Sequence, residues 1–226
     1  MRRGKIFELE ARVANDQDYF HSLEICRDYD LNIRSSMIVP MGKVTTKVID
    51  FCHDGDVVLD IGTATGLLAL RIGGQNSKLD IIGVDDNENL LQVAEENAAL
   101  AAICNSPGMV EFRYGEMEDL PFADHSVDVV YSYSAFHKWS NPIAVLKEIN
   151  RVCKPDGSVY LYDIARDSDE GMISFILQYI SSGQDDFLRE LKSSYTVDEV
   201  AEILKQAGLE HWKVTAEDIN LAVSKR

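Results

Sequence analysis

The sequence of 226 residues predicts an α/β fold built on a doubly wound, mostly parallel sheet. Two observations lead to this prediction. From residue 44 onward, short apolar runs of strand length alternate with helical patterns, which is typical of a parallel sheet covered by helices. The sequence then ends in two strand-like runs joined by a tight connection, and such a hairpin cannot be parallel throughout.

Seven segments have the residue pattern of strands. The first five are the parallel candidates, because they are short and mostly apolar, as strands buried on both faces should be. They are residues 57–60, 79–85, 109–114, 126–133 and 158–163. The last two are residues 211–218 and 220–226. We therefore expect a seven-stranded sheet with a C-terminal antiparallel hairpin.

Capping residues mark the ends of several helices. Asn141 is a plausible N-cap for a helix over 142–153, since a proline follows it, and a Lys-Pro-Asp-Gly turn at 154–157 ends that helix. Thr196 opens a capping box for the last helix. Gly208 stands where a glycine typically ends a helix.

Two segments fit the alternating pattern less well. Residues 1–43 combine short helical patterns with an extended-looking stretch at 35–42, and we interpret them as an N-terminal helical segment or cap. Residues 44–226 are the main domain, and residues 166–194 are a helical insertion within it. Because no repeat or low-complexity linker divides the chain, both segments are expected to be additions to one domain.

The bulk composition argues against several classes of protein. The formal charge is −16, from 38 acidic and 22 basic residues, whereas nucleic-acid binders usually need a basic face, so no nucleic acid partner is expected. No apolar run approaches the roughly 18 residues of a membrane helix, so no membrane partner is expected. The N-terminus lacks a signal-peptide core, which indicates a cytoplasmic location. Four widely spaced cysteines give no metal-site pattern, so no metal is expected.

The stretch from Val57 to Leu70 is the strongest functional signal. An apolar strand reaches Asp60 and then the small-residue loop 62–66, and Asp85 ends the second strand. Ligands of open parallel sheets bind at such strand ends. A dinucleotide motif, G-x-G-x-x-G, would need glycine where the loop has Ala64 and the helix has Leu67. A ligand with a cationic amine, a sulfonium and a free ribose fits an acidic strand end better.

Four ordered motifs carry a resemblance to a known family. They are residues 57–66, 81–87, 115–139 and 146–164. In residue pattern and spacing the chain resembles class I S-adenosylmethionine-dependent methyltransferases. Within that class it is similar to the small-molecule type that includes the ubiquinone and menaquinone biosynthesis methyltransferases. The resemblance implies a Rossmann-like fold, S-adenosylmethionine as cofactor and S-adenosylhomocysteine as product.

The resemblance also implies a set of cofactor-binding residues. Asp60 would face the ammonium group, and Asp85 would accept hydrogen bonds from the ribose hydroxyls. The full set expected to bind the cofactor is Asp60, Gly62, Thr63, Ala64, Gly66, Asp85, Asp86, Asn87, Glu116, Met117, Ser132, Tyr133 and Ser134. Three departures from the family pattern are Ala64, at a usual glycine, Glu116, where aspartate is commoner, and the ending Tyr-Ser-Tyr-Ser of the fourth strand. That ending argues against amide and nucleobase-amine acceptors.

His137 is the candidate catalytic residue, as a general base after the fourth strand, although a histidine there could equally cap the next helix. The expected function is transfer of a methyl group to a small-molecule acceptor by in-line displacement. Two alternatives stay open at this point. One is an NAD-dependent oxidoreductase on a related fold, and the other is a non-catalytic S-adenosylmethionine-binding partner subunit. A homodimer also stays open.

Overall fold

We analysed a computed structural model, which describes residues 11–14, 19–36, 38–104, 108–179 and 183–225. The helices are α1 (Leu23–Ser36), α2 (Ile38–Phe51), α3 (Leu67–Gln75), α4 (Glu88–Cys104), the short 3₁₀ helix η1 (Phe136–Lys138), α5 (Pro142–Val152), α6 (Glu170–Tyr179), α7 (Gln184–Ser193) and α8 (Val197–Gln206). Within these described ranges, no helix combines the length and the apolar character needed to cross a membrane.

The strands form one seven-stranded sheet. They are β1 (Val57–Ile61), β2 (Asp80–Asp85), β3 (Met109–Tyr114), β4 (Val127–Tyr133), β5 (Cys153–Ile164), β6 (Lys213–Glu217) and β7 (Asn220–Lys225). Their order in the sheet is β3-β2-β1-β4-β5-β7-β6. The pairs among β1 to β5 are parallel, whereas β7 is antiparallel to both β5 and β6. The expected fold class is therefore confirmed.

Helices cover both faces of the sheet. On one face, Val48 of α2 and Ile72 of α3 pack with sheet residues such as Tyr131. On the other face, Ile149 of α5 and Leu204 of α8 pack with a second set of sheet residues. The strands alternate buried side chains between these two layers, which explains why the central strands are almost wholly apolar.

The capping residues act as their patterns predict. The Asn141 side chain accepts a hydrogen bond from the backbone N–H of Ala144 at the start of α5. Thr196 and Glu199 form both bonds of a capping box at the start of α8. Gly208 has a φ of 76° after α8, as a helix-ending glycine should.

Two segments differ in detail from the expectation. Residues 38–42, part of the stretch expected to be extended, form the first turn of α2. Pro40 made the stretch look extended, but proline is tolerated in a first helical turn, where its missing N–H has no intrahelical partner. In addition, β5 starts at Cys153 rather than at 158, and a register irregularity between residues 153 and 158 accommodates the expected turn.

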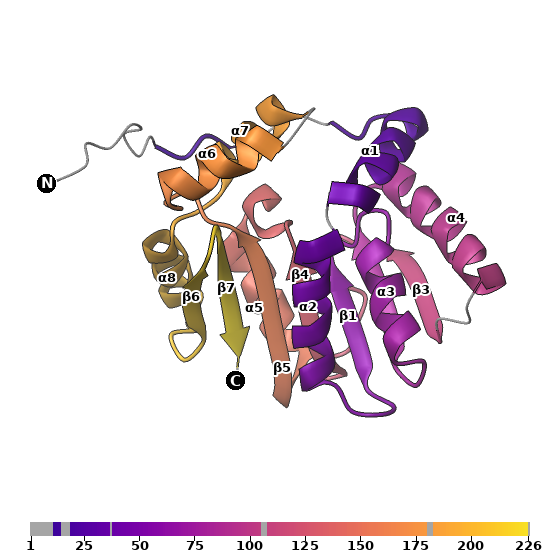
Figure 1. The fold of residues 1–226 in the computed structure, drawn as a ribbon. Coiled ribbons are helices and arrows are strands. Elements are labelled where there is room, and N and C mark those ends of the chain that lie inside the picture. The colour runs from indigo at the N-terminus through magenta and orange to yellow at the C-terminus, as the bar shows by residue number, and fades with distance from the viewer. Residues whose placement is uncertain (1–10, 15–18, 37, 105–107, 180–182, 226) are drawn as a thin grey trace, which may run out of the picture.

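A layer of helices lies beyond the carboxyl ends of the parallel strands, at the top of Figure 1, where α1, α6 and α7 are found. The described residues 11–14 run along α7, because the backbone N–H of Val13 donates to the carbonyl of Lys192 at 3.1 Å. The chain's N-terminal part and the insertion therefore meet over the same edge of the sheet, the edge where open α/β sheets bind ligands.

Gly66 provides a stability test of the turn from β1 into α3. It has a φ of 74°, and a Cβ there would collide with the Phe112 ring and press on Ala94. We expect Gly66→Ala to reduce the free energy of unfolding by about 2–4 kcal/mol, because overpacking adds to left-handed strain. Urea denaturation checks this value.

Gly208→Ala is the matched control. Gly208 has a similar φ of 76°, but nothing lies within 4 Å of a Cβ added there. Its substitution should cost only the conformational strain, about 1 kcal/mol. Equal losses in the two variants would contradict the steric explanation for Gly66.

Candidate functional site

The loop between β1 and α3 folds back onto the end of β2. The backbone N–H groups of Gly62 and Thr63 both donate to the carbonyl of Val84, at 2.9 and 3.0 Å. Gly62 has a φ of 71°, and a Cβ there would lie 2.7 Å from that of Ala135. Only glycine fits this position, so the chain after β1 can pass close to the chain after β4.

Ala64 takes a conformation that usually belongs to glycine, with a φ of 50°. This backbone geometry directs its N–H to the Asp85 carboxylate, at 2.8 Å. Its methyl group packs against a small apolar cluster in which α1 contributes Cys26 and α4 contributes Leu90 and Val93. The methyl group therefore contacts the helical layer above the loop.

Asp60 is a buried carboxylate, with 2% of its surface exposed. It accepts a hydrogen bond from the Thr63 hydroxyl at 2.8 Å. Burial raises the pKa of Asp60 to about 7, against the effect of the Thr63 and Tyr131 side chains, and the nearby Asp85 charge raises it further. A buried carboxylate in such surroundings favours a positively charged ligand group.

Asp85 is the second buried carboxylate, with 6% exposed. One oxygen accepts the N–H of Ala64, and the other accepts the N–H of Asn87 at 3.1 Å. Burial raises the pKa of Asp85 to about 6, while these two bonds act in the opposite direction. Each oxygen keeps a further lone pair, so the group still has the acceptor capacity to bind a diol.

The loop after β2 connects the site to the N-terminal segment. The Asn87 side chain accepts the N–H of Leu90 at the start of α4, and its amide donates to the carbonyl of Phe20 at 3.2 Å. Asn89 donates to the same carbonyl at 3.1 Å. Asn87 was expected beside the adenine, and here it holds Phe20 over the end of β2.

The remaining residues expected on the adenine side lie around the ends of β2 and β3. Asp86 and Glu116 are exposed, and Glu116 accepts a hydrogen bond from the Tyr114 hydroxyl at 2.8 Å. Partial desolvation by neighbouring groups raises the pKa of Asp86, and the Glu116 charge raises it further. Met117 is buried and belongs to the apolar core under α5 and α8. The structure therefore brings two carboxylates and one apolar side chain to this edge.

The residues at the end of β4 have structural partners. The Ser132 hydroxyl donates to the carbonyl of Ile61 at 2.7 Å and so joins β4 to β1. The Tyr133 ring stacks on Tyr162 with ring centres 6.2 Å apart, and burial raises the pKa of Tyr133. Ser134 has a φ of 57° and donates its N–H to Tyr162. The Ser132 hydroxyl has therefore used its one donor and keeps only its acceptor lone pairs.

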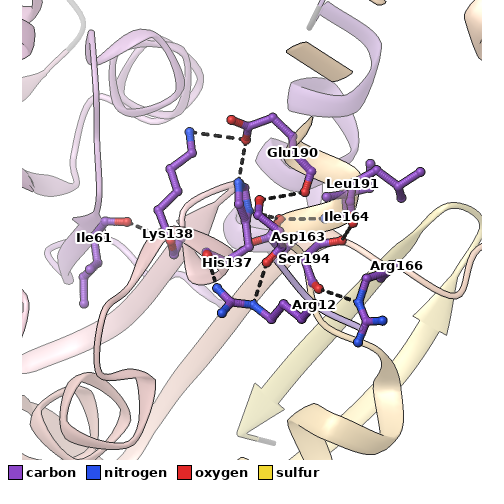
Figure 2. A network of polar contacts seen from close by, with 12 residues as sticks. Arg12, Ile61, His137, Lys138, Asp163, Ile164, Arg166, Glu190, Leu191 and Ser194 are labelled. Carbon is purple, nitrogen blue, oxygen red and sulfur yellow. Dashed lines mark hydrogen bonds and ion pairs between the residues drawn. The ribbon is translucent and has the colours of Figure 1, made fainter. Parts of the chain in front are cut away.

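His137 sits between two carboxylates, as Figure 2 shows. Its Nδ1 lies 2.8 and 2.9 Å from the Asp163 oxygens, at the end of β5. Its Nε2 lies 2.5 Å from Glu190 of α7. The backbone N–H of His137 also donates to Asp163. With 1% of its surface exposed, His137 joins β5 and α7 to the end of β4.

The two carboxylates keep His137 charged. Burial lowers the pKa of His137, but Asp163 and Glu190 outweigh it and raise the pKa to about 9. Burial alone would raise the pKa of Glu190, but its contacts with Lys138 and His137 outweigh burial and lower that pKa to about 2. At neutral pH the imidazole is protonated and both N–H groups are engaged. This arrangement favours a structural role over the general-base role expected from the sequence, because a protonated ring has no lone pair.

Arg12 completes the network from the N-terminal side. Its guanidinium donates to the carbonyls of Ser193 and His137, both at 2.7 Å, and lies 4.2 Å above the Tyr195 ring. Sequence reasoning did not find Arg12 or Glu190, since they lie 125 and 53 residues from His137 and carry no local motif. Asp163 lies at the end of the predicted strand 158–163, and this position was the only feature of the sequence that pointed to it.

His137 generates a prediction about stability and pH. An imidazolium whose folded pKa is about 9 stabilises the fold fully below about pH 6.5, and that contribution is lost as the pH rises through about 9. We expect His137→Gln to cost about 2–4 kcal/mol near pH 6.5 and clearly less near pH 10. Urea denaturation at both pH values checks this.

The exposed His53 gives the control for that experiment. His53→Gln also removes a histidine and should change the free energy of unfolding by less than about 0.5 kcal/mol at either pH. A loss in His137→Gln that stays the same from about pH 6.5 to 10 would contradict the charged state assigned to His137.

Comparison with known proteins adds independent findings. Residues 59–161 match the family model described as a methyltransferase domain. An arsenite methyltransferase of Halobacterium salinarum is 29% identical over 168 residues, which cover 73% of this chain and 40% of the relative. A demethylmenaquinone methyltransferase of Bacillus cereus is 28% identical over 191 residues, covering 76% of this chain and 77% of the relative. Two other relatives are also matched over less than half of their own length.

Solved structures agree with the fold. The crystal structure of a protein from Aquifex aeolicus, described as an S-adenosylmethionine-dependent methyltransferase, superposes with a TM-score of 0.65 at 22% identity. The alignment covers 90% of this chain and 97% of that one. The matched family model begins at Leu59 in β1 and ends at Leu161 in β5, so it includes the glycine loop, both buried carboxylates and His137. Over residues 59–161 the chain is therefore similar to the methyltransferase-domain family, and its overall fold is that of the S-adenosylmethionine-dependent methyltransferases.

Proposed function

We propose that this chain transfers a methyl group from S-adenosylmethionine to a small-molecule acceptor. The observation that carries the proposal is the pair of buried carboxylates, Asp60 and Asp85, beside the glycine loop, each with a pKa raised by burial. Such a pair suits a ligand that brings both a cation and a diol. The residues fit the cofactor, because Asp60 is suited to the ammonium group and Asp85 to the ribose hydroxyls.

The other expected contacts of the cofactor follow once its ammonium group lies at Asp60 and its ribose at Asp85. Met117 and the residues after β2 would flank the adenine, and the backbone after β4 would pass along the methionine part. When bound, S-adenosylmethionine supplies a methyl group that an acceptor lone pair takes in line as the C–S bond breaks, giving S-adenosylhomocysteine and, from a protonated acceptor, a proton. The chain's own contribution is alignment of the two molecules and exclusion of water.

The N-terminal segment and the insertion would build the acceptor side. Phe20 is held over β2 by Asn87 and Asn89, and Glu190 of α7 is held over β4 and β5 by His137. Arg189 of α7 lies 5.9 Å from the ring of Tyr19, so the two segments also meet each other. The relatives are named for demethylmenaquinone and arsenite, which supports a small acceptor.

Ligand binding is the first test. At about 100 times its dissociation constant, a ligand adds roughly 2.7 kcal/mol, which raises the unfolding midpoint of a chain of this size by about 5–10 °C. We expect this shift with S-adenosylmethionine and with S-adenosylhomocysteine, but not with NAD. The shift should disappear in Asp85→Ala, because that change removes the acceptor for the ribose hydroxyls.

Asp80→Ala is the matched control, since Asp80 lies at the opposite end of the same strand. It should keep the shift. A shift with NAD alone would favour the oxidoreductase alternative, and no shift with either adenosyl ligand would contradict the proposal. Binding without any turnover over a panel of acceptors would favour a non-catalytic subunit.

The pH dependence of binding gives a second test. Asp60 and Asp85 have raised pKa values of about 7 and about 6, so part of each is protonated below neutral pH. A bound ammonium group favours the ionised form, and binding should therefore release protons. We expect affinity for S-adenosylhomocysteine to rise from about pH 5.5 to 8, by at most about tenfold per pH unit per group. Calorimetry in buffers of different ionisation enthalpy measures both the affinity and the protons released.

Asp60→Asn is the informative variant here. It removes the group with the higher pKa, so the dependence of affinity on pH between about 6.5 and 8 should flatten. Affinity that falls with pH over this interval would contradict the assignment of the ammonium group to Asp60.

A further inference from the structure

Lys138 is the residue from which we draw a further inference. It ends η1, directly after the buried His137, and its side chain is 35% exposed. Its ammonium lies 3.5 Å from an oxygen of Glu190. Figure 2 shows that Lys138 and His137 approach this carboxylate from two sides. His137 is therefore enclosed in the fold, whereas Lys138 reaches the edge of the candidate site.

The two cations do not share Glu190 equally. The same Glu190 oxygen lies 2.5 Å from His137 and 3.5 Å from Lys138. Charged N–H···O bonds are usually about 2.7–2.9 Å long, so the contact with Lys138 is a loose one. An ammonium has three N–H donors. Lys138 can therefore bind a second anionic oxygen while Glu190 keeps its bond to His137.

The surroundings of Lys138 place it on the acceptor side. Burial lowers the pKa of Lys138, but Glu190, Tyr29 and Asp163 outweigh it and raise that pKa, so the side chain stays charged. Lys138 in turn acts to lower the pKa of Asp85, the residue assigned to the ribose. The ammonium thus contacts Glu190 of α7 from the segment that follows β4, and Arg189, beside Glu190, lies 5.9 Å from the ring of Tyr19 in the N-terminal segment. These are the elements that surround the proposed methyl-transfer site.

We propose that Lys138 binds an anionic oxygen of the methyl acceptor, either a carboxylate or an ionised acidic hydroxyl. The inference rests on the proposed function and adds the chemical class of the substrate. A lysine ammonium at this place attracts negative charge and lowers the pKa of a hydroxyl beside it. It also stabilises an oxyanion as the oxygen approaches the cofactor.

Small probes test the inference without knowledge of the acceptor. The protein is saturated with S-adenosylhomocysteine and titrated by calorimetry with benzoate, benzamide, 4-nitrophenolate and nitrobenzene. Benzoate against benzamide reports on a carboxylate, and 4-nitrophenolate against nitrobenzene reports on an ionised hydroxyl. We expect at least one anion to bind about tenfold more tightly than its neutral analogue.

Variants identify the residue responsible. Lys138→Met should remove the preference for the anion, and Lys138→Arg should retain it because the charge is kept. Lys147→Met, which removes an exposed lysine of α5, should leave the preference unchanged. The shift in unfolding midpoint with S-adenosylhomocysteine should persist in all three variants, which shows that they fold.

The outcomes separate the two proposals. If S-adenosylhomocysteine does not bind the wild-type protein, the proposed function fails. If it binds but no anion binds better than its neutral analogue, or the preference survives in Lys138→Met, the proposal for Lys138 is overturned.

Discussion

The backbone turn at the end of β1 is the constraint on which the rest of the structure depends. Two successive N–H groups, from Gly62 and Thr63, share the carbonyl of Val84, and Ala64 donates to Asp85. This pattern requires β1 and β2 to be parallel neighbours in the observed register, with Ile61 opposite Val84. It also requires glycine beside Ala135. Once the turn is fixed, α3 starts against the sheet and both buried carboxylates face the same edge.

A second set of contacts holds the helical layer over that edge. Asn87 and Asn89 bind the carbonyl of Phe20, while His137 binds Glu190. Arg12 then connects the N-terminal segment to His137 and to Ser193. These contacts come from loops after different strands, so the layer is held at several separate points. Parallel strands bring their carboxyl ends to one edge, which is why residues so distant in sequence meet here.

Most of the fold could be predicted from the sequence, because the residue patterns that indicate its helices and strands are local. The apolar runs of the strands, the cap at Asn141 and the capping box at Thr196 each act within a few residues. The glycine loop and the two strand-end aspartates were found for the same reason. Residues 38–42 were interpreted wrongly, because a proline in the first turn of a helix resembles a proline in an extended segment.

Other features depended on tertiary contacts. The ionised state of His137 requires Asp163 and Glu190, which are 26 and 53 residues away. The Ser132 hydroxyl is committed to the backbone of Ile61, which no pattern in the fourth strand indicates. The pKa shifts of Asp60 and Asp85 come first from burial, and burial is a property of the assembled layers. Residue type and spacing could therefore indicate a candidate site but not the protonation of its residues.

Ala64 couples the loop after β1 to the helical layer above it. An alanine with a φ of 50° costs about 1–2 kcal/mol relative to an ordinary conformation. Its methyl group offsets part of that cost by packing on the cluster formed between α1 and α4. If α1 moves away from the sheet, the strain stays while the packing is lost, and the loop becomes less stable. The shape of the loop between β1 and α3 and the seating of α1 are thus coupled, so a change in α1 that removes this packing also weakens the loop.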